Sequence, residues 1–556
     1  MQKRMPIGVD DFLEAAANYY LVDKTAFIKD FLDHHAQVTL VTRPRRFGKT
    51  LTMSMLDYFF SIEKGKQTKE LFRSLAIGHI DGNYMKYQGT KPVIFMTLKG
   101  VENDTWPLLF GAYKYCVQRE YQKYRKIYES GHLAEEEKRY FARMLDLTGS
   151  EEDYQQSLYK LSKFLHDYYH VKPIILLDEY DAPLQYAYTH GFYDEAITFF
   201  RSWFNNGLKS NEHLDFALLT GVLRLAKESI FSGLNNLDVC TVTGNKYAET
   251  FGFTEDDVAH MAADLGRESK LPELKHWYDG YRIGNQSIYN PWSVVCYFAG
   301  DCHPMPYWVN TSANDILHRL LHHADVPRIE MIHDLLEGKT VRVTLNESVI
   351  YKDIAKDRSA LFTMLLTTGY LTIDGISPSS YNRFSLRIPN EEVRLVYSTE
   401  ILNHLADGVN RDTFDTLFDA LLYGDAREFE QYLQTILLHV VSAFDTAGKE
   451  AFYHGLLLGM TALFLDKDYE IRSNEESGYG RFDLAVFPKK ENAAGVIMEF
   501  KVAENAEHLE SKAQEALEQI EEKKYDTIFS DRNISKVWKY GISFCGKQVK
   551  VLSLSQ

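Results

Sequence analysis

The sequence predicts an α/β protein of several domains, and three observations carry this prediction. Short apolar runs alternate with amphipathic helical segments through the first half of the chain. A basic, glycine-containing loop follows the first of these runs, and paired carboxylates follow the third. Two further apolar runs near the carboxyl terminus carry an aspartate and a glutamate. With 556 residues, the chain is also too long for one hydrophobic core.

Composition is typical of a soluble globular protein, with 45% hydrophobic and 25% charged residues. The formal net charge of -16 excludes a chain that coats nucleic acid indiscriminately, although it permits a local basic groove. The five cysteines are odd in number and lack metal-type spacing, which predicts free thiols in a reducing compartment. Neither a signal-peptide core nor an apolar run of about 18 residues is evident. We therefore expect a cytoplasmic protein that does not bind a membrane.

Four apolar runs of the first half are expected to form strands that are buried on both faces. They are compact and lack clean alternation, and they span 37–42, 91–98, 172–181 and 214–221. The segments between them, such as 153–170, have helical periodicity. This order predicts a mostly parallel sheet covered on both sides, with its ligands at the carboxyl ends of the strands.

The loop after the first run reads RPRRFGKT, and a helical pattern begins at its Lys49. Backbone N–H groups of a tight turn and a helix N-terminus together form an anion site. We expect Lys49 to reach the β and γ phosphates of ATP and the Thr50 hydroxyl to ligate Mg²⁺. Gly48 would allow the backbone to approach the phosphates closely.

The arginines of this loop leave two interpretations open. Arg43 stands where the first glycine of a phosphate-binding loop belongs, so either the loop is a modified version or the match is accidental. Arg43 could contact phosphate or brace the turn through a neighbouring carboxylate. Arg45 and Arg46 could touch phosphate themselves or face another partner.

The third run, PIILLDEYD, supplies the acidic half of the same site. Asp178 follows four apolar residues at the end of a buried strand, where it could hold Mg²⁺ directly or through water. Glu179 could polarise the attacking water. The alternative is that both residues are solvated acids at an ordinary strand end. The basic loop upstream argues against this alternative.

The fourth run ends in Thr220, which we expect beside the γ phosphate as a sensor. Arg224 follows one turn later and could act as an arginine finger. A capping threonine and a surface arginine are the equally open alternative.

Five motifs in order over the first 240 residues resemble the AAA-ATPase-like family of bacterial proteins, a branch of the additional-strand P-loop ATPases. They are GVDDF, YYLVDKT, TRPRRFGKTLTMSML, LLDEYDAPL and TGVLRLAKESIFSGLNNL. The resemblance implies that Arg43 belongs to a family version of the loop. It also implies that Tyr20, Asp23 and Lys24 lie near the nucleotide.

The middle of the chain, 251–405, has a mixed and largely helical pattern. Thr254 with acids behind it predicts the start of a helix. LFTMLLTTGYLTI and FSLRIPNEEVRLVY predict a helix, a hairpin and a second helix, in an arrangement like a winged helix. A lid or a domain-coupling role is preferred over DNA binding here. Asp279 and Arg282 are expected to be structural.

A second chemistry is carried by GRFDLAVF and GVIMEFKV, which predict two strands joined by a polar turn. Period-two geometry places Glu499 and Lys501 on one face, and an antiparallel hairpin would set Asp483 beside Glu499. Two such carboxylates bind a hard cation, and a nearby lysine can orient or activate water. This is the logic of metal-dependent phosphodiester hydrolysis.

Helical segments on either side could add further groups. Glu450, in a helical pattern over 449–464, could supply a third carboxylate or could simply be a first-turn acid. Gln519 and Tyr525 could position the site or belong to a solvated helix.

The order Glu, Asp, Glu-x-Lys resembles the PD-(D/E)XK nuclease superfamily, in the branch usually fused to this ATPase family. Phe482 stands where the superfamily name has proline. The resemblance implies a restriction-endonuclease-like α/β domain that uses Mg²⁺, with Mn²⁺ as an alternative, at Asp483 and Glu499.

Together these features predict three domains: an AAA-like P-loop ATPase over 1–250, a winged-helix-like lid region over 251–405 and a nuclease-like domain over 406–556. The preferred interpretation is an ATPase coupled to a nuclease that acts on DNA rather than RNA. By resemblance only, such proteins are linked with defence or mobile elements. A nucleotide-driven switch or scaffold is the rival interpretation, and a homo-oligomer stays open.

Overall fold

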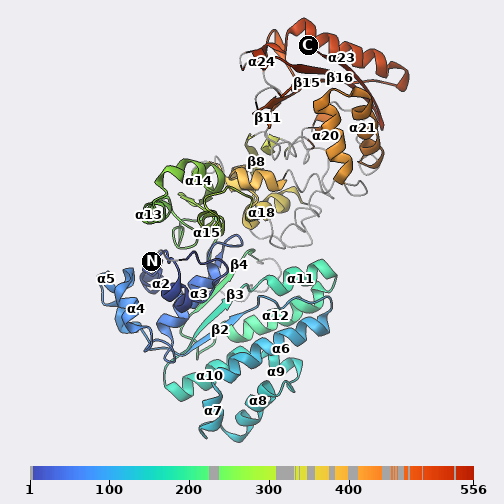
Figure 1. Ribbon diagram of the computed structural model, residues 1–556. Coiled ribbons are helices and arrows are strands. Elements are labelled where there is room, and N and C mark those ends of the chain that lie inside the picture. Colours follow the sequence, from blue (N-terminus) through green and yellow to red (C-terminus); the bar gives the residue numbers. More distant parts are fainter. Residues whose placement is uncertain are drawn as a thin grey trace. The chain divides into compact units, whose positions relative to one another are not determined.

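The computed structural model describes most of the chain (Figure 1). The described residues are 4–34, 36–224, 237–308, 331, 334–336, 338–346, 357–374, 382–397, 411–440, 453–454, 456–457, 460, 469–473, 476–490, 493–530, 532 and 534–555. They fall into two compact units, the first drawn from Met1–Trp308 and Arg342–Glu392, the second from Val309–Val341 and Val393–Gln556. The predicted boundary at 250 falls inside the first unit, and the three-domain division stays a prediction.

A five-stranded parallel sheet forms the centre of the first unit. Its strands are β1 (Val38–Thr42), β2 (Val93–Thr97), β3 (Ile174–Asp178), β4 (Ala217–Gly221) and β5 (Leu237–Cys240). The order is β2-β3-β4-β1-β5, and each neighbouring pair is parallel. The parallel sheet expected from the apolar runs is confirmed, and β4 lies between β1 and β3. The sequence analysis did not foresee β5, because LDVC is too short and too polar to stand out.

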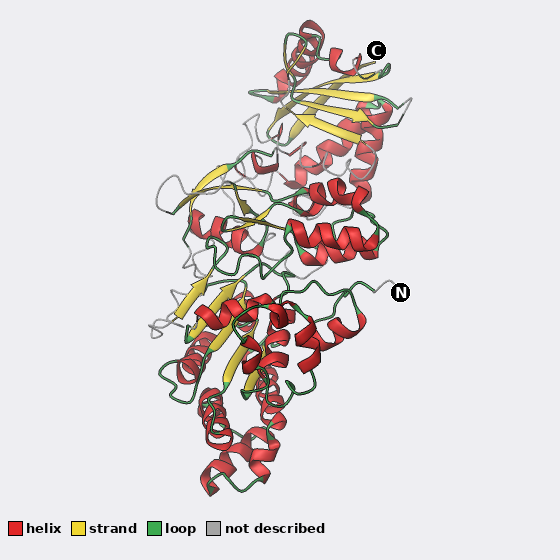
Figure 2. Cartoon of the chain, turned by 90° about the vertical axis from the view of Figure 1, so that its left-hand side faces the viewer, coloured by secondary structure: helices red, strands yellow, loops and turns green. Residues whose placement is uncertain are grey.

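Helices cover both faces of this sheet (Figures 1 and 2). They are α1 (Phe12–Asn18), α2 (Ala26–His34), α3 (Lys49–Phe60), α4 (Lys69–Ser74), α5 (Ala76–His79), α6 (Trp106–Lys123), α7 (Arg125–Glu129), α8 (Glu135–Leu145), α9 (Glu151–Gln155), α10 (Ser157–Tyr169), α11 (Ala182–His190) and α12 (Tyr193–Leu208). Side chains of α2 and α3 pack on one face against alternate strand residues such as Val41 and Leu176. In Figure 1, α6, α10 and α12 gather on the opposite side. Because helices bury both faces of the sheet, its strands do not alternate between apolar and polar residues.

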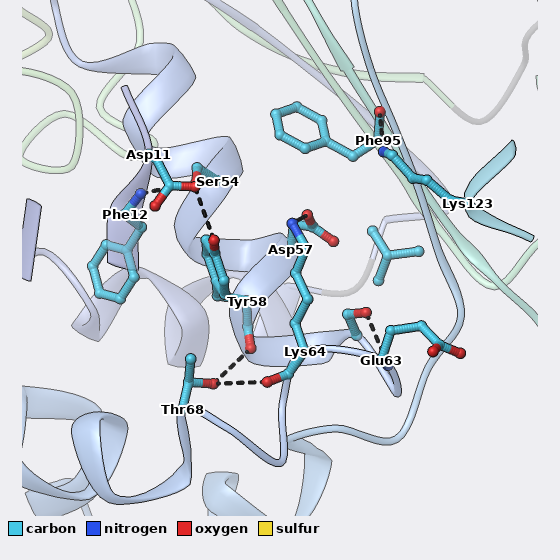
Figure 3. Close-up of polar contacts among 12 residues, drawn as sticks. Asp11, Phe12, Ser54, Asp57, Tyr58, Glu63, Lys64, Thr68, Phe95 and Lys123 are labelled. Atoms are coloured by element: carbon cyan, nitrogen blue, oxygen red, sulfur yellow. Dashed lines mark hydrogen bonds and ion pairs between the residues drawn. The ribbon is translucent and has the colours of Figure 1, made fainter. Parts of the chain in front are cut away.

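Polar side chains anchor α3, the helix that follows the basic loop (Figure 3). The Ser54 hydroxyl accepts a hydrogen bond of 3.0 Å from the backbone N–H of Phe12, and the Tyr58 hydroxyl donates to Asp11 across 2.9 Å. Asp57, which is buried, pairs with Lys64 at 2.5 Å. Buried polar groups are costly unless they are hydrogen-bonded, so these contacts explain how α3 tolerates them.

A mixed region of helices and short strands packs against the amino-terminal part of the first unit. It comprises α13 (Glu255–Leu265), α14 (Leu271–Tyr278), β6 (Tyr281–Ile283), β7 (Gln286–Ile288), α15 (Pro291–Ala299), β8 (Val341–Thr344), α18 (Arg358–Thr368), β9 (Thr372–Ile373) and β10 (Arg383–Arg387). Thr254 caps α13 by accepting from the Asp257 N–H. The order helix, hairpin, helix is present in α18, antiparallel β9 and β10, and helical residues 391–397, of which 393–397 belong to the second unit. The likeness to a winged helix stays a prediction.

The second unit contains a mixed five-stranded sheet. Its strands are β11 (Tyr469–Ser473), β14 (Leu484–Pro488), β15 (Gly495–Val502), β16 (Val537–Cys545) and β17 (Gln548–Ser555), in that spatial order. Only β15 and β16 pair in parallel. Helices α20 (Arg411–Tyr423) and α21 (Ala426–Val440) pack on one face, and α23 (Leu509–Lys523) packs on the other. No helix among the described residues is long and apolar enough to cross a bilayer.

Candidate active sites

The loop between β1 and α3 turns at two residues in the left-handed region. Arg46 has a φ of 70° and Gly48 a φ of 79°. Gly48 is the N-cap of α3, and glycine adopts this conformation without the strain that a side chain brings. Left-handed residues in a turn that leads into a helix aim successive N–H groups into one concavity. The local geometry is therefore that of an anion site.

Lys49 lies across this loop with its side chain buried. Its ammonium group donates to the carbonyls of Arg43 at 3.0 Å and Pro44 at 2.8 Å. Burial lowers the pKa of Lys49, while the nearby carboxylates of Glu179 and Asp178 oppose that shift. A buried cation at the mouth of an N–H concavity is suited to a phosphate group.

The Asp178 carboxylate is held by hydroxyls from three other elements. Thr50 on α3 donates to Oδ2 across 2.7 Å, and Thr220 at the end of β4 donates to Oδ1 across 2.6 Å. Thr97 at the end of β2 adds a longer contact of 3.4 Å. The structure thus brings together Thr50, Asp178 and Thr220, which the sequence analysis assigned to one site. Thr97, which lies within the apolar run 91–98, was not assigned to the site from the sequence.

Glu179 follows Asp178 in an unusual backbone conformation, with a φ of 51°. Burial raises its pKa, as does the negative charge of Asp178, while Lys49 has the opposite effect. A carboxyl group whose pKa is raised toward neutrality is better matched to accepting a proton than an exposed glutamate. Non-glycine residues in this region of backbone space cluster at functional sites.

Arg43 is fully buried. Its guanidinium donates to the carbonyls of Thr42 at 2.9 Å, Cys240 and Lys246 at 3.0 Å, and Tyr247 at 3.3 Å. Burial lowers the pKa of Arg43 to about 10. The sequence analysis named Arg43 as a phosphate contact or a brace through a carboxylate. The structure places it instead on backbone carbonyls that join β1 to β5 and to the following turn.

Arg46 extends toward the mixed region rather than along the loop. Its guanidinium stacks 4.1 Å from the centroid of the Trp292 ring, at the start of α15. Burial lowers the pKa of Arg46, with smaller opposing effects from Cys296 and Glu179. Both alternatives for Arg46, contact with phosphate and contact with another partner, stay predictions.

Asp181 is a buried residue that the sequence analysis quoted without assigning. Its carboxylate accepts from the N–H groups of Val222 at 3.0 Å and Leu223 at 2.7 Å, and burial raises its pKa. A side chain at Gly221 would meet this carboxylate at 2.5 Å. Asp181 therefore fixes the backbone directly after Thr220 and before Arg224. Arg224 is the last described residue before 237, and its role as an arginine finger stays a prediction.

Three residues of the YYLVDKT motif, Tyr20, Asp23 and Lys24, have partners outside the loop between β1 and α3. Tyr20 donates to Asp264 of α13 at 2.6 Å, and Lys24 pairs with Asp257 of the same helix. Asp23 accepts from the Ala76 N–H at 2.7 Å and from Thr25. These contacts tie the amino-terminal segment to α13 and α5, whereas proximity to the nucleotide stays an expectation.

The second candidate site lies on β14 and β15 of the second unit. These strands are antiparallel with Leu484 opposite Met498, and one further step of this register sets Asp483 opposite Glu499. Asp483 accepts from the Phe500 N–H across 2.7 Å. Lys501 lies 3.6 Å from the buried Glu499 carboxylate. The hairpin geometry expected from the sequence is therefore present.

Further groups surround this carboxylate pair. Gln519 of α23 donates to Glu499 and contacts the Tyr525 hydroxyl at 3.1 Å. His454, which is also buried, has its Nδ1 atom 4.0 Å from Asp483. No role for this histidine was indicated by the sequence. Glu450 lies outside the described residues, so its carboxylate stays a prediction.

Both sites carry donor sets that fit divalent ions. A threonine hydroxyl hydrogen-bonded to a buried aspartate, beside a buried lysine, matches what Mg²⁺ with a nucleotide phosphate requires. Two carboxylates on neighbouring strands, one of them buried beside a lysine, match a hard cation at a phosphodiester.

Comparison with known proteins gives the same division of chemistry. Residues 6–231 match the family described as predicted AAA-ATPase, and residues 448–553 match the PD-(D/E)XK nuclease superfamily. The fusion expected from the sequence motifs is confirmed. The chain is also 26% identical over 535 residues to a protein of Azotobacter chroococcum mcd 1, described as an uncharacterized protein in the vnfD 5′ region. That similarity covers 94% of this chain and 93% of the other.

Proposed function

The protein is a fusion of an AAA-ATPase-like domain with a PD-(D/E)XK nuclease domain. From this we propose that it is an ATPase that controls a metal-dependent nuclease. The observation that carries the first half is the Asp178 carboxylate held between Thr50 and Thr220. β4, which carries Thr220, lies between β1, which leads into the loop, and β3, which carries Asp178. Mg²⁺ bound with ATP would neutralise the phosphate charge.

In the proposed ATPase, each group has a separate task. Lys49 leaves its loop carbonyls to contact phosphate oxygens, and Thr50 and Asp178 hold Mg²⁺. Glu179, with its raised pKa, orients the attacking water and accepts its proton. Thr220 senses the γ phosphate through the carboxylate that it shares with Thr50.

The nuclease half is proposed to cut DNA by metal-assisted hydrolysis. Asp483 and Glu499 would hold Mg²⁺ or Mn²⁺, which when bound polarises the scissile phosphate. Lys501, 3.6 Å from Glu499, orients the water that attacks the phosphorus atom. Gln519 fixes the rotamer of Glu499 by donating to it.

The mixed region is proposed to carry the nucleotide signal. Arg46 stacks on Trp292, and Phe47, the next residue of the loop, packs edge-on against Tyr281 with centroids 5.1 Å apart. A change in the loop on ATP binding or hydrolysis would therefore move side chains that hold α15 and β6.

That region leads to both points where the chain leaves the first unit. Ser293 of α15, beside Trp292, donates to both oxygens of the fully buried Glu392 at 3.0 and 2.8 Å. Glu392 also accepts from the Trp308 N–H at 2.8 Å. Trp308 and Glu392 are the residues after which the chain passes into the second unit. This contact series is a physical route by which ATP could control cleavage.

A cleavage assay on linear, circular and single-stranded DNA and on RNA tests the proposal. We expect cleavage of DNA with Mg²⁺ or Mn²⁺ that changes in rate when ATP is added. Lys49→Ala should remove the effect of ATP, and Glu179→Gln should bind ATP without turnover. If wild type shows no ATP-dependent thermal shift with Mg²⁺, the ATPase half is wrong.

A nucleotide-driven scaffold is the second candidate, and the net charge of -16 favours it because DNA is an anion. Wild-type protein that binds ATP but leaves all of these substrates intact, with either metal, would establish the scaffold.

A further inference from the structure

A group of three potential metal ligands lies in the first unit and shares no residue with either candidate site. Among the residues that the structure describes, His166, Asp167 and His213 are the one set of three or more whose donor atoms all lie within 4.8 Å of one another. The Nδ1 atoms of the two histidines are 3.0 Å apart. Their rings are tilted by 65°, so they meet nitrogen to nitrogen rather than as a stack.

Two separate elements supply these residues. His166 and Asp167 lie in the last turns of α10, and His213 lies in the loop that leads from α12 into β4. The loop is fixed by Asn211, which donates to the Gly207 carbonyl at 2.8 Å and accepts from the His213 N–H at 3.0 Å. The Asn211 side chain thus fixes the backbone of His213, and the cluster is not needed to hold it.

The location separates this group from the nucleotide. The segments that carry it precede β3 and β4, whereas Asp178 and Thr220 lie at the carboxyl ends of those strands. A five-residue strand spans roughly 16 Å at about 3.3 Å per residue. The cluster therefore cannot serve the metal of a bound nucleotide.

We propose that His166, His213 and Asp167 form a binding site for a borderline transition-metal ion of the Zn²⁺ class. Imidazole nitrogens suit Zn²⁺ over Mg²⁺, and two histidines with one carboxylate leave a fourth position for water. Ligands on a tetrahedral Zn²⁺ lie about 3.3 Å apart at Zn–N distances near 2.0 Å. The 3.0 Å between the nitrogens is within a small side-chain rotation of that separation.

Among the described residues of α10, Lys163 competes for the Asp167 carboxylate. It pairs with Oδ2 of Asp167 at 2.8 Å and with Glu137 at 2.7 Å. A carboxylate has two oxygens, so Oδ1 can ligate an ion while Oδ2 retains the ammonium group. The pair also aims the carboxylate, as hydrogen bonds to metal ligands commonly do.

A simple hydrogen bond between two neutral histidines is the competing explanation, and the two differ in what they require of Asp167. The hydrogen bond needs no carboxylate and gives no metal affinity. The metal site loses affinity when either histidine or the aspartate is replaced. Neither outcome depends on ATP binding or on nuclease activity.

Isothermal titration of the full chain with ZnCl₂ tests the site. The titrated protein carries Asp483→Asn and Glu499→Gln, so that the nuclease carboxylates do not contribute. In this background we expect one equivalent of Zn²⁺ to bind at the cluster. Each of the variants His166→Gln, His213→Gln and Asp167→Asn should weaken this binding at least tenfold. MgCl₂ at a hundredfold excess should not displace Zn²⁺.

The matched control is His170→Asn at the C-cap of the same helix, an exposed position in the left-handed region that asparagine accepts. This variant should bind Zn²⁺ like the parent. Cobalt(II) substitution gives a second readout, because its visible absorption should be strong in the control and lost in the histidine variants.

Equal Zn²⁺ affinity in His213→Gln and His170→Asn would overturn the proposal, as would displacement by MgCl₂. Unchanged binding in Asp167→Asn would overturn the three-ligand site. Asp167 is exposed, so this variant keeps the test informative if a histidine variant fails to fold.

Discussion

The Thr50 hydroxyl donates to Oδ2 of Asp178 across 2.7 Å, although 128 residues separate the two in the chain. The contact joins the first turn of α3 to the end of β3, and with it the basic half of the candidate ATPase site to the acidic half. It brings together the two residues that would hold Mg²⁺ in the proposed site.

Replacing Thr50 by alanine is expected to weaken Mg²⁺-dependent ATP binding about 10-fold or more. Loss of a hydrogen bond to a charged group costs about 1.5–3 kcal/mol, and a metal ligand is lost as well. Calorimetry with ATP, with and without Mg²⁺, measures this. Thr52→Ala is the control, because the Thr52 hydroxyl donates to the Gly48 carbonyl within the same helix and not to Asp178. Equal losses in both variants would contradict a metal role for Thr50.

Arg43→Gly restores the residue expected at the start of a phosphate-binding loop, yet we predict no gain in ATP affinity. The guanidinium satisfies four backbone carbonyls in a buried position. Leaving buried acceptors unsatisfied costs about 1–3 kcal/mol for each group that water cannot reach. A lower unfolding midpoint is therefore expected, and Arg43→Lys should not rescue it, because an ammonium group lacks the planar fork. A clear affinity gain by calorimetry in Arg43→Gly would show the arginine to be a defect.

Trp292→Leu tests the route from the nucleotide loop. The ring accepts the Arg46 guanidinium at 4.1 Å, and its Nε1 donates to the Tyr307 carbonyl at 3.1 Å. We expect the variant to bind ATP normally while cleavage loses its dependence on ATP. Trp277→Leu, a partly buried tryptophan on α14, serves as the control. If ATP still regulates cleavage in Trp292→Leu, the signal takes another route.

The sequence predicted most of the ATPase-like site, for reasons that are local. Buried parallel strands produce continuous apolar runs, so their carboxyl ends, and hence Asp178 and Thr220, could be located from the sequence. The hairpin of Asp483 and Glu499 followed from period-two geometry. In both places the chemistry lies next to the element that positions it.

What the sequence could not supply depends on long-range packing. The partners of Arg43 come from Cys240 and from the turn at 246–247, about 200 residues away. The burial of Asp181 is set by the loop after β4, which meets it only in the folded chain. The sequence could not decide whether Arg46 contacts phosphate or another partner. Its contact Trp292 belongs to a distant region, and the loop sequence does not indicate that this region packs against it.

Glu392 should make the first unit less stable as pH rises. Burial raises the pKa of this carboxyl from 4.5 to about 7 in the folded chain. The folded state therefore binds the proton more tightly than the unfolded state. The stabilisation is fully present below about pH 4.5 and is lost as pH rises through about 7, an effect on the order of 3 kcal/mol.

Glu392→Gln should flatten this dependence, because the amide keeps an acceptor for the Trp308 N–H without a charge. Urea unfolding midpoints between about pH 5 and 8 measure the effect. The adjacent Glu391→Gln is the control and should follow wild type. Parallel curves for wild type and Glu392→Gln would exclude Glu392 as the titrating group.

The final prediction concerns the carboxylate pair of the second unit. Asp483→Asn and Glu499→Gln should each abolish cleavage and reduce Mn²⁺ affinity. Asp483 lies opposite Glu499 in the strand register, and both are expected to ligate one ion. Lys501→Ala should keep the metal but lose rate by about 10²-fold, the usual scale for a proton-transfer or water-orienting group.

Glu515→Gln, an exposed acid of α23 paired with Lys512, is the control and should leave cleavage unchanged. All of these variants should bind ATP as wild type does, since the nucleotide site lies in the other unit. Mn²⁺ affinity that survives both carboxylate changes would mean that the two residues do not share an ion, and cleavage that survives them would assign any nuclease activity to another part of the chain.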